Sequence, residues 1–200
     1  MVAVPDSPIP TASCKLANTG TNAGCRVDRQ SYADAIRRAY EGEIVGERLY
    51  RALAMQCSDA DQRSKLSAIS AIEAATHERL KHIAERLQID LSQTAIQCTV
   101  ERRLAQLRLL SWGEFIQKAV LEWPPYLARF EVLRQAAASG DEESLQFLED
   151  HERALVQFVN LEHSGSENSL SALSTFLQGC RQAAVRFPEP TSPIAAAKSS

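Results

Sequence analysis

Two hundred residues, of which 44% are hydrophobic and 24% charged, are enough for one globular domain with a substantial core. The formal net charge of -3, with Arg and Lys scattered along the chain, argues against a nucleic-acid partner, because such proteins concentrate basic residues on one face. No apolar run approaches the roughly 20 residues that cross a membrane, and the opening MVAVPDSPIP lacks the features of a secretion signal. The sequence therefore predicts a cytoplasmic protein without a membrane or nucleic-acid partner.

The two ends of the chain differ in composition from its middle. Residues 1–28 and 188–200 are rich in proline and in small or polar residues and lack hydrophobic periodicity. Such segments have little apolar surface to offset the entropy that ordering costs. We expect two flexible tails that flank a single domain at residues 29–187.

Cysteines give no sign of a zinc site or of a thiol-exchange motif. They are odd in number, widely spaced and without a CxxC pair. We expect free, reduced thiols at all five positions, which are Cys14, Cys25, Cys57, Cys98 and Cys180.

The first half of the central domain has the pattern of three helices. Apolar residues at three- and four-residue steps predict helices over residues 30–55 and 61–87, with polar breakers and a candidate cap at residues 58–61. Asp90-Leu91-Ser92 closes this pair. A shorter third helix is marked by apolar residues at helical spacing, namely Val100, Leu104, Leu107 and Leu110.

The second half continues in the same way. A fourth helical segment begins at Trp112 and reaches about Ser139, and Pro124–Pro125 should kink or break it. Two further helices are predicted over residues 141–163 and 168–186, each with a polar or acidic start. Strand-like alternation of useful length is absent from the sequence. The predicted fold is all-α, an antiparallel helical bundle with additional short helices.

Carboxylates lie on the apolar faces of four of these helices. In the second helix the stripe of Leu66, Ile69 and Leu80 passes through Glu73, and His77 follows one turn later. The other carboxylates that share an apolar stripe are Glu43 and Glu47 in the first helix, Glu122 ahead of the prolines, and Glu152 and Glu162 in the fifth, where His151 borders the stripe. Glu162, at the helix end, has the alternative of fixing the following loop.

Several inward carboxylates need compensation. An ionised carboxylate in a core costs several kcal/mol unless cations, shared protons or water accompany it. A pair of metal ions is one solution that helical bundles use, with glutamates and histidines facing inward. Inward Arg or Tyr side chains, such as Arg48, Tyr40 or Tyr50, are the other, and they would form a buried polar network without metal.

Three segments carry a resemblance to a known family. EGEIVGERLYRALA in the first helix, IEAATHERL in the second and DHERALVQFVNLEH in the fifth resemble a divergent ferritin-like protein over residues 30–163. The resemblance implies a four-helix bundle that holds two irons and activates dioxygen, for oxidation of a substrate or for iron storage. It implies that the metal ligands are Glu43 or Glu47, Glu73, Glu122 and Glu152, with His77 and His151 as the imidazoles.

The sequence departs from that family at its most specific motif. The family carries Glu-x-x-His in two helices, whereas here Thr76 lies three residues after Glu73, and Leu148 lies three residues before His151. The site could therefore be dinuclear with an unusual set of ligands, mononuclear, or inactive.

Three functions follow as hypotheses. The leading one is a non-haem iron or manganese oxidase or oxygenase that takes dioxygen and an unidentified small molecule, in a pocket lined by Tyr40, Phe115 and Tyr126. The second is a metal-free helical-bundle protein for binding or scaffolding, whose buried carboxylates each meet a donor. The third is acid/base catalysis by paired carboxylates without metal. The assembly stays open, with a homodimer as one candidate.

Overall fold

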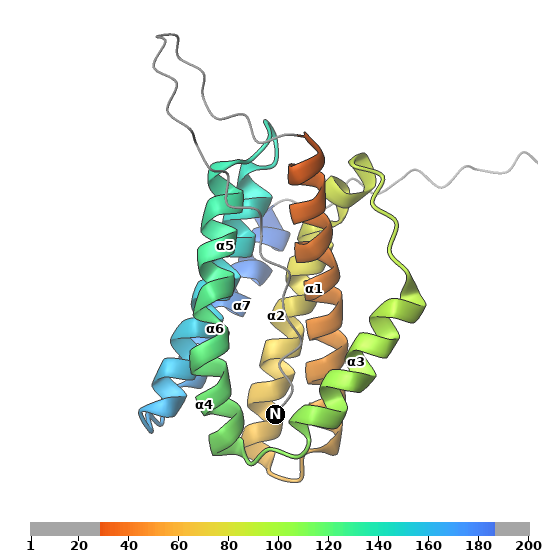
Figure 1. Cartoon of the computed structure of the whole chain (residues 1–200). Helices are drawn as coiled ribbons and strands as arrows, with labels where there is room; N and C mark the ends of the chain where they lie inside the picture. Colours follow the sequence, from red (N-terminus) through yellow and green to blue (C-terminus); the bar gives the residue numbers. More distant parts are fainter. Residues whose placement is uncertain (1–28, 187–200) are drawn as a thin grey trace, which may run out of the picture.

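The computed structural model describes residues 29–186, which form seven helices and no strand within that range (Figure 1). The predicted all-α bundle is therefore confirmed. The expected tails at residues 1–28 and 188–200 lie outside the described residues, and so do Cys14 and Cys25. Cys57, Cys98 and Cys180 are free thiols, as expected. Among the described helices, none combines the length and apolar character that crossing a membrane requires.

Helices α1 (Arg29–Gln56) and α2 (Ala60–Arg86) form an antiparallel pair. The polar break predicted between them contains the cap of α2, because the Asp59 side chain accepts a hydrogen bond from the Gln62 amide at 2.9 Å. Helix α3 (Gln93–Leu107) then packs on the outer side of α1. The contact is apolar and joins Ile44, Val45, Ile96 and Val100.

The proline pair divides the fourth segment into two helices, α4 (Trp112–Glu122) and α5 (Pro124–Gln135). The prolines occupy the first positions of α5, where their missing amide hydrogens leave no intrahelical bond unmade. A capping box between Ser111 and Glu114 fixes the start of α4. Helix α5 ends at Gln135, earlier than the predicted end near Ser139.

Helix α6 (Glu142–His163) runs through the bundle and contacts α2, α4, α5 and α7 (Leu170–Arg186). Helices α1, α2, α6 and the α4–α5 pair surround the core, while α3 lies outside α1, and α7 lies against α2 and α6 (Figure 1). Asp141, directly before α6, is fully buried. It accepts hydrogen bonds from Tyr32 at 2.7 Å and from Arg86, and so ties the starts of α1 and α6 to the end of α2.

The apolar core is divided into two parts along the bundle. One part joins the start of α1 to the end of α2 and to α5 and α6, around Ile36, Leu80, Ile83, Leu145 and Leu148. The other joins the end of α1 to the start of α2 and to α4, α6 and α7, around Leu66, Ile69, Ile72, Phe115 and Phe158. Each of the three long helices carries polar residues between the two parts, whereas Trp123 at the α4–α5 break packs within the second part.

Candidate metal centre

Three side chains from three helices meet between the two apolar parts. They are Glu43 of α1, Glu73 of α2 and His151 of α6, all buried, with ligand atoms within 4.8 Å of one another. Nε2 of His151 lies 3.2 Å from Oε2 of Glu43 and 4.0 Å from Oε2 of Glu73. A fourth buried carboxylate, Glu152, has its Oε2 at 3.7 Å from the same nitrogen. The helical spacing predicted that Glu43, Glu73 and Glu152 face inward and placed His151 at the border of its stripe; all four side chains are buried.

The orientation of the His151 ring is fixed by the backbone. Nδ1 lies 2.6 Å from the carbonyl oxygen of Leu148, which can only accept, so Nδ1 carries the ring hydrogen. Burial lowers the pKa of His151 to about 4, and the ring is neutral at pH 7. Nε2 therefore presents a lone pair to the surrounding carboxylates. This is the tautomer in which a histidine binds a metal ion through Nε2.

Two buried atoms of the cluster have no hydrogen-bond partner within the part of the chain that the structure describes. They are Nε2 of His151 and Oε2 of Glu43, which face each other with lone pairs on both sides. Within residues 29–186, no Lys or Arg forms an ion pair with Glu43, Glu73 or Glu152. A cation between these atoms, either a metal ion or a proton, removes the repulsion.

The pKa values of the carboxylates show the same shortage of positive charge. Burial raises the pKa of Glu43 well above its usual value, and the charge of Glu73 adds to the shift. Burial also raises the pKa of Glu152 and brings that of Glu73 to about 7. The charge of Arg103, an exposed residue of α3, lowers the pKa of Glu73 without forming an ion pair. Without a metal ion, the cluster therefore keeps protons near neutral pH.

Glu162 shows how the same chain compensates a carboxylate that is paired inside the protein. It accepts hydrogen bonds from Lys65 at 2.9 Å, from Trp112 at 2.8 Å and from Ser169. Although burial alone raises its pKa, these donors lower it overall. Glu162 thus connects α6 with α2, with α4 and with the residues before α7. This agrees with the alternative that Glu162 fixes the loop after its helix. Among residues 29–186, Glu43, Glu73 and Glu152 accept no hydrogen bond from a Lys, Trp or Ser side chain.

A glycine of α1 makes room for Glu73. A Cβ atom at Gly46 would lie 2.6 Å from Cδ of Glu73 and 2.8 Å from each of its carboxylate oxygens. The carboxylate therefore lies directly against the backbone of α1. The role of Gly46 was not predicted from the sequence. A glycine in the middle of a long helix is unfavourable, however, and so indicates that another group approaches the helix backbone closely.

Glu47 and His77 form a separate pair at the edge of the cluster. Nδ1 of His77 lies 3.1 Å from Oε2 of Glu47, and Nε2 lies 3.1 Å from Oε1 of Glu78. Glu47 also pairs with Arg51. Both members of the pair are more exposed than Glu43 and His151, and neither belongs to the three-residue group.

The expectation that Glu122 faces the core is wrong. Glu122 is exposed and pairs with Lys118 of its own helix. The buried face of α4 continues from Ala119 to the half-buried Trp123 rather than to Glu122, because the helix ends here and the prolines start a new register. Within the described residues, the α4–α5 pair therefore gives the cluster no carboxylate.

Aromatic groups lie beside the cluster instead. The ring of Phe130 in α5 lies 6.2 Å from that of His151 between centroids. Tyr50 of α1 is buried, and burial together with the charges of Glu73 and Glu152 raises the pKa of its hydroxyl. The ligand set is thus bordered by aromatic surface. The three aromatic residues expected to line one pocket do not gather there, since Tyr126 is exposed, Phe115 belongs to one apolar part and Tyr40 packs against the other.

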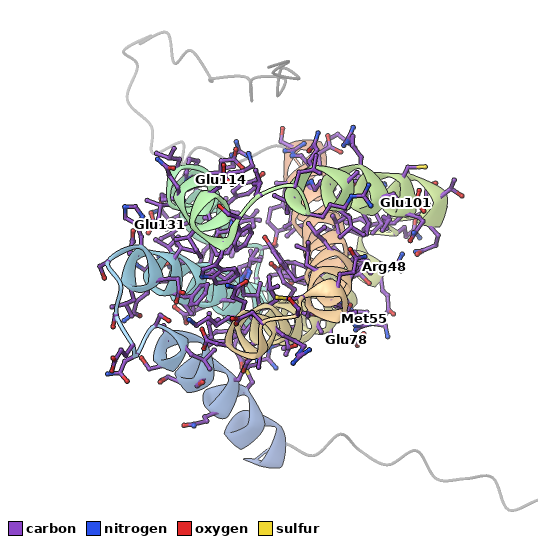
Figure 2. All side chains as sticks on the ribbon, turned by 90° about the horizontal axis from the view of Figure 1, so that it is seen from below. Arg48, Met55, Glu78, Glu101, Glu114 and Glu131 are labelled. Carbon is purple, nitrogen blue, oxygen red and sulfur yellow. The ribbon has the colours of Figure 1, made fainter. Side chains whose placement is uncertain are left out.

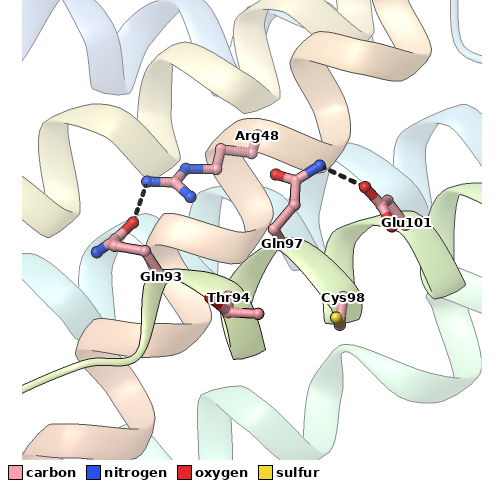
Figure 3. A pocket seen from close by; sticks show the side chains of 6 residues that line it. All are labelled: Arg48, Gln93, Thr94, Gln97, Cys98 and Glu101. Atoms are coloured by element: carbon pink, nitrogen blue, oxygen red, sulfur yellow. Dashed lines mark hydrogen bonds between the residues drawn. The ribbon is translucent and has the colours of Figure 1, made fainter.

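Arg48 does not compensate the carboxylates. Its guanidinium donates to Oε1 of Gln93 at 2.8 Å, across a groove of about 480 Å³ between α1 and α3 (Figure 3). The groove is otherwise lined by Thr94, Gln97, Cys98 and Glu101, and it includes no residue of the cluster. Over the described part of the chain, no hydrogen bond connects Tyr40 or Tyr50 with the cluster either. None of the three donors expected for a metal-free network therefore compensates the buried carboxylates.

Comparisons of the chain with models of protein families, with curated proteins and with solved structures give no match. The class of protein is therefore described from its fold and its buried cluster alone. It is a helical bundle with a buried Glu/Glu/His group that has the geometry to hold a metal ion.

Proposed function

We propose that the protein is a non-haem metal oxidase or oxygenase, with iron or manganese held by Glu43, Glu73, His151 and Glu152. The observation that carries the proposal is the pair of buried, unpartnered atoms at the centre, Nε2 of His151 and Oε2 of Glu43 at 3.2 Å. A metal ion satisfies both atoms at once. A proton shared between these two atoms also satisfies them, but the other buried carboxylates then need protons of their own.

The donor set favours iron or manganese. Carboxylate oxygens suit hard ions such as Mn²⁺, imidazole nitrogen suits Fe²⁺ and Zn²⁺, and the cluster has no thiolate among its four members. Two ionised carboxylates and one neutral imidazole neutralise a divalent ion, a third carboxylate can stay protonated or add a negative charge, and positions remain for exogenous ligands. The carbonyl of Leu148 orients His151, as the outer contacts of metal-binding histidines commonly do.

Open positions beside aromatic surface suit the chemistry of dioxygen. A bound ferrous or manganous ion supplies a redox centre at which dioxygen is activated. Phe130 and Tyr50 border the cluster and restrict water there. A small, largely apolar substrate fits this environment best, and its identity is the next question after the metal.

The number of metal ions depends on whether the pair at the edge of the cluster, Glu47 and His77, acts as a set of ligands. In a dinuclear centre, Glu47 and His77 serve as permanent ligands of a second ion, next to Glu73. In a mononuclear centre they stay outside the ligand set. The distances favour the mononuclear form, because within residues 29–186 one group of three ligand atoms converges, that of Glu43, Glu73 and His151, and no second such group gathers around Glu47 and His77.

The metal-free alternative, a bundle for binding or scaffolding, has less support. It requires a buried donor for each carboxylate. A protonated Glu43 can donate to Glu73, but within residues 29–186 no Lys or Arg forms an ion pair with Glu43, Glu73 or Glu152. Its remaining support is that raised pKa values permit a protonated cluster. Acid/base catalysis without metal draws on the same observation.

Metal content separates these functions. We would purify the protein from iron-supplemented cells and compare it with the Glu73→Gln, Glu152→Gln double variant and with a Glu131→Gln, Glu142→Gln control, in which Glu131 is half-buried, Glu142 is exposed and neither belongs to the cluster. Near-equimolar iron or manganese in the wild type and the control, lost in the cluster variant at equal helicity, supports the proposal. Oxygen consumption by the ferrous form then tests the oxidase activity. Absence of metal from all three proteins, also after incubation with Fe²⁺ or Mn²⁺, would leave the metal-free bundle.

A further inference from the structure

We propose that Glu78, His77 and Glu47 form the route by which a cation passes from solvent to the buried cluster. This inference rests on the proposed metal site, and it concerns the path of the ion rather than its final ligands. His77 contacts both Glu78 and Glu47, so the three side chains form a row that crosses from α2 to α1. Glu73 lies at the inner end of this row.

Exposure decreases stepwise along this row. The side chain of Glu78 is 61% exposed, that of His77 17% and that of Glu73 11%. Glu78 lies at the periphery of the helices, on the outer side of α2 (Figure 2). His151, at the inner end, is fully buried. A cation that starts at Glu78 thus exchanges water for protein ligands one step at a time, which avoids desolvating it at once.

His77 has the chemistry of an intermediate position. Its Nε2 is hydrogen-bonded to the Glu78 carboxylate, which only accepts, so Nε2 carries a hydrogen. Nδ1 then presents a lone pair to Oε2 of Glu47 at 3.1 Å, and this buried nitrogen has no hydrogen-bond partner. The arrangement repeats that of His151 and Glu43 nearer to the surface. An ion can be held here, but with fewer ligands than in the cluster.

Glu47 connects this position with the cluster. It follows Gly46, whose backbone supports the Glu73 carboxylate, and it lies one helical turn after Glu43. Ser70 of α2 donates to the carbonyl oxygen of Glu47 at 2.9 Å and keeps the two helices in register here. An ion that leaves Glu47 therefore meets Glu73 next.

The other approaches to the cluster are less suitable for an ion. The two apolar parts of the core close the bundle on both sides along its axis, and Phe130 lies against His151. The groove between α1 and α3 contains Arg48, which repels cations, and no residue of the cluster. The carboxylates of the route also attract cations, and such local fields raise association rates by about tenfold or more.

Two basic side chains compete with an ion on this route. Arg51 pairs with Glu47, and Lys81 lies 3.6 Å from Glu78. Their removal leaves the carboxylates free to take a metal ion. A route therefore makes predictions of opposite sign for the acidic and basic residues along it, which a purely structural set of ion pairs does not.

The test measures the rate of Co²⁺ uptake by the metal-free protein, followed by visible absorption in stopped flow, and the rate of release to EDTA. The variants His77→Phe, which keeps the ring size, and Glu78→Gln lie on the route. His82→Ala and Glu85→Gln are matched controls, because both residues are exposed on the same helix. Lys81→Ala is the variant of opposite sign. Equilibrium titration with Co²⁺ gives the stoichiometry and Kd of each protein.

We expect uptake and release to slow about tenfold in His77→Phe and by a smaller factor in Glu78→Gln, with Kd and equimolar stoichiometry unchanged. Uptake should be faster in Lys81→Ala and unchanged in both controls. Unchanged rates in His77→Phe and Glu78→Gln overturn the proposal. A loss of stoichiometry or of affinity in His77→Phe also overturns it, because His77 is then a permanent ligand. If the wild type binds no Co²⁺, the metal site fails together with its route.

Discussion

The carboxylate of Glu73 lies against the backbone of Gly46, so closely that a β-carbon on residue 46 would be 2.6 Å from Cδ of Glu73. A glycine on α1 thus decides where a carboxylate of α2 can lie. The contact links the packing of two helices to the geometry of the cluster, since the same carboxylate reaches to 4.0 Å from His151.

We predict that Gly46→Ala weakens metal binding about 10- to 100-fold, because the new methyl group displaces the Glu73 carboxylate. The side chain of Glu73 can rotate away, so the fold should persist. Gly42→Ala is the matched control, since Gly42 is exposed on the same helix with no atom near its added Cβ. It should stabilise the protein by about 0.5–1 kcal/mol and leave the affinity unchanged. Equal affinities in the two variants would contradict the role of Gly46.

The stability of the metal-free protein should fall as pH rises. Glu73 has a pKa of about 7 in the folded protein against 4.5 in its ordinary state, so the folded protein binds more protons between these values and loses stability as pH rises through them. His151 acts in the opposite direction, because its pKa falls from 6.5 to about 4 and its contribution grows with pH over that window. Above 6.5 only the loss from the carboxylates remains.

Urea denaturation between about pH 5 and pH 8 measures this effect. The free energy of unfolding of the wild type should decrease most clearly above pH 6.5, where the contribution of His151 is complete. Glu73→Gln should show a smaller decrease. The same slope in both proteins would mean that Glu73 does not carry the raised pKa.

Metal affinity should rise with pH over the same range. Binding requires ionised carboxylates, and burial raises the pKa values of Glu43, Glu73 and Glu152, so a metal ion must displace their protons. For each proton released, the affinity for Co²⁺ should increase about tenfold per pH unit below the pKa. Isothermal titration calorimetry in buffers of different ionisation enthalpy counts these protons. An affinity that does not change below pH 7 would show that the carboxylates are already ionised.

Asp141 should matter for stability and not for metal. It is fully buried and accepts hydrogen bonds from Tyr32 and Arg86 at the end of the bundle. Asp141→Ala leaves the buried Tyr32 hydroxyl without its acceptor and the half-exposed Arg86 without its carboxylate. It should destabilise the protein by about 1–3 kcal/mol, whereas Asp150→Ala, at an exposed position of α6, should cost much less. Chemical denaturation checks the difference. Co²⁺ affinity below the unfolding transition should be the same in both.

Glu122→Ala should leave metal content and affinity unchanged, because this carboxylate is exposed and paired with Lys118. Glu43→Ala, by contrast, removes a carboxylate 3.2 Å from His151 and should abolish tight binding. Metal analysis of the two variants at equal helicity makes the comparison. Loss of metal in Glu122→Ala would show that Glu122 is a metal ligand after all.

The inward faces of the long helices were predictable from the sequence. A regular helix repeats every 3.6 residues, so a stripe of leucines and isoleucines shows which glutamates share their face. Glu43, Glu73 and Glu152 were identified in this way, and His151 at the border of its stripe. The rule failed at Glu122, because Pro124–Pro125 ends one helix and begins another, and the periodicity does not continue across that break.

Periodicity and helix caps are local properties, and they are enough to predict that this chain forms helices with carboxylates on their apolar faces. Which of these carboxylates share one centre and which are paired elsewhere depends on how the helices pack in three dimensions. Glu162 meets three donors, and Glu47 meets His77, while Glu43 meets the lone pair of His151. These differences depend on how far the helices are shifted along one another, and that shift is fixed by contacts between residues distant in the chain.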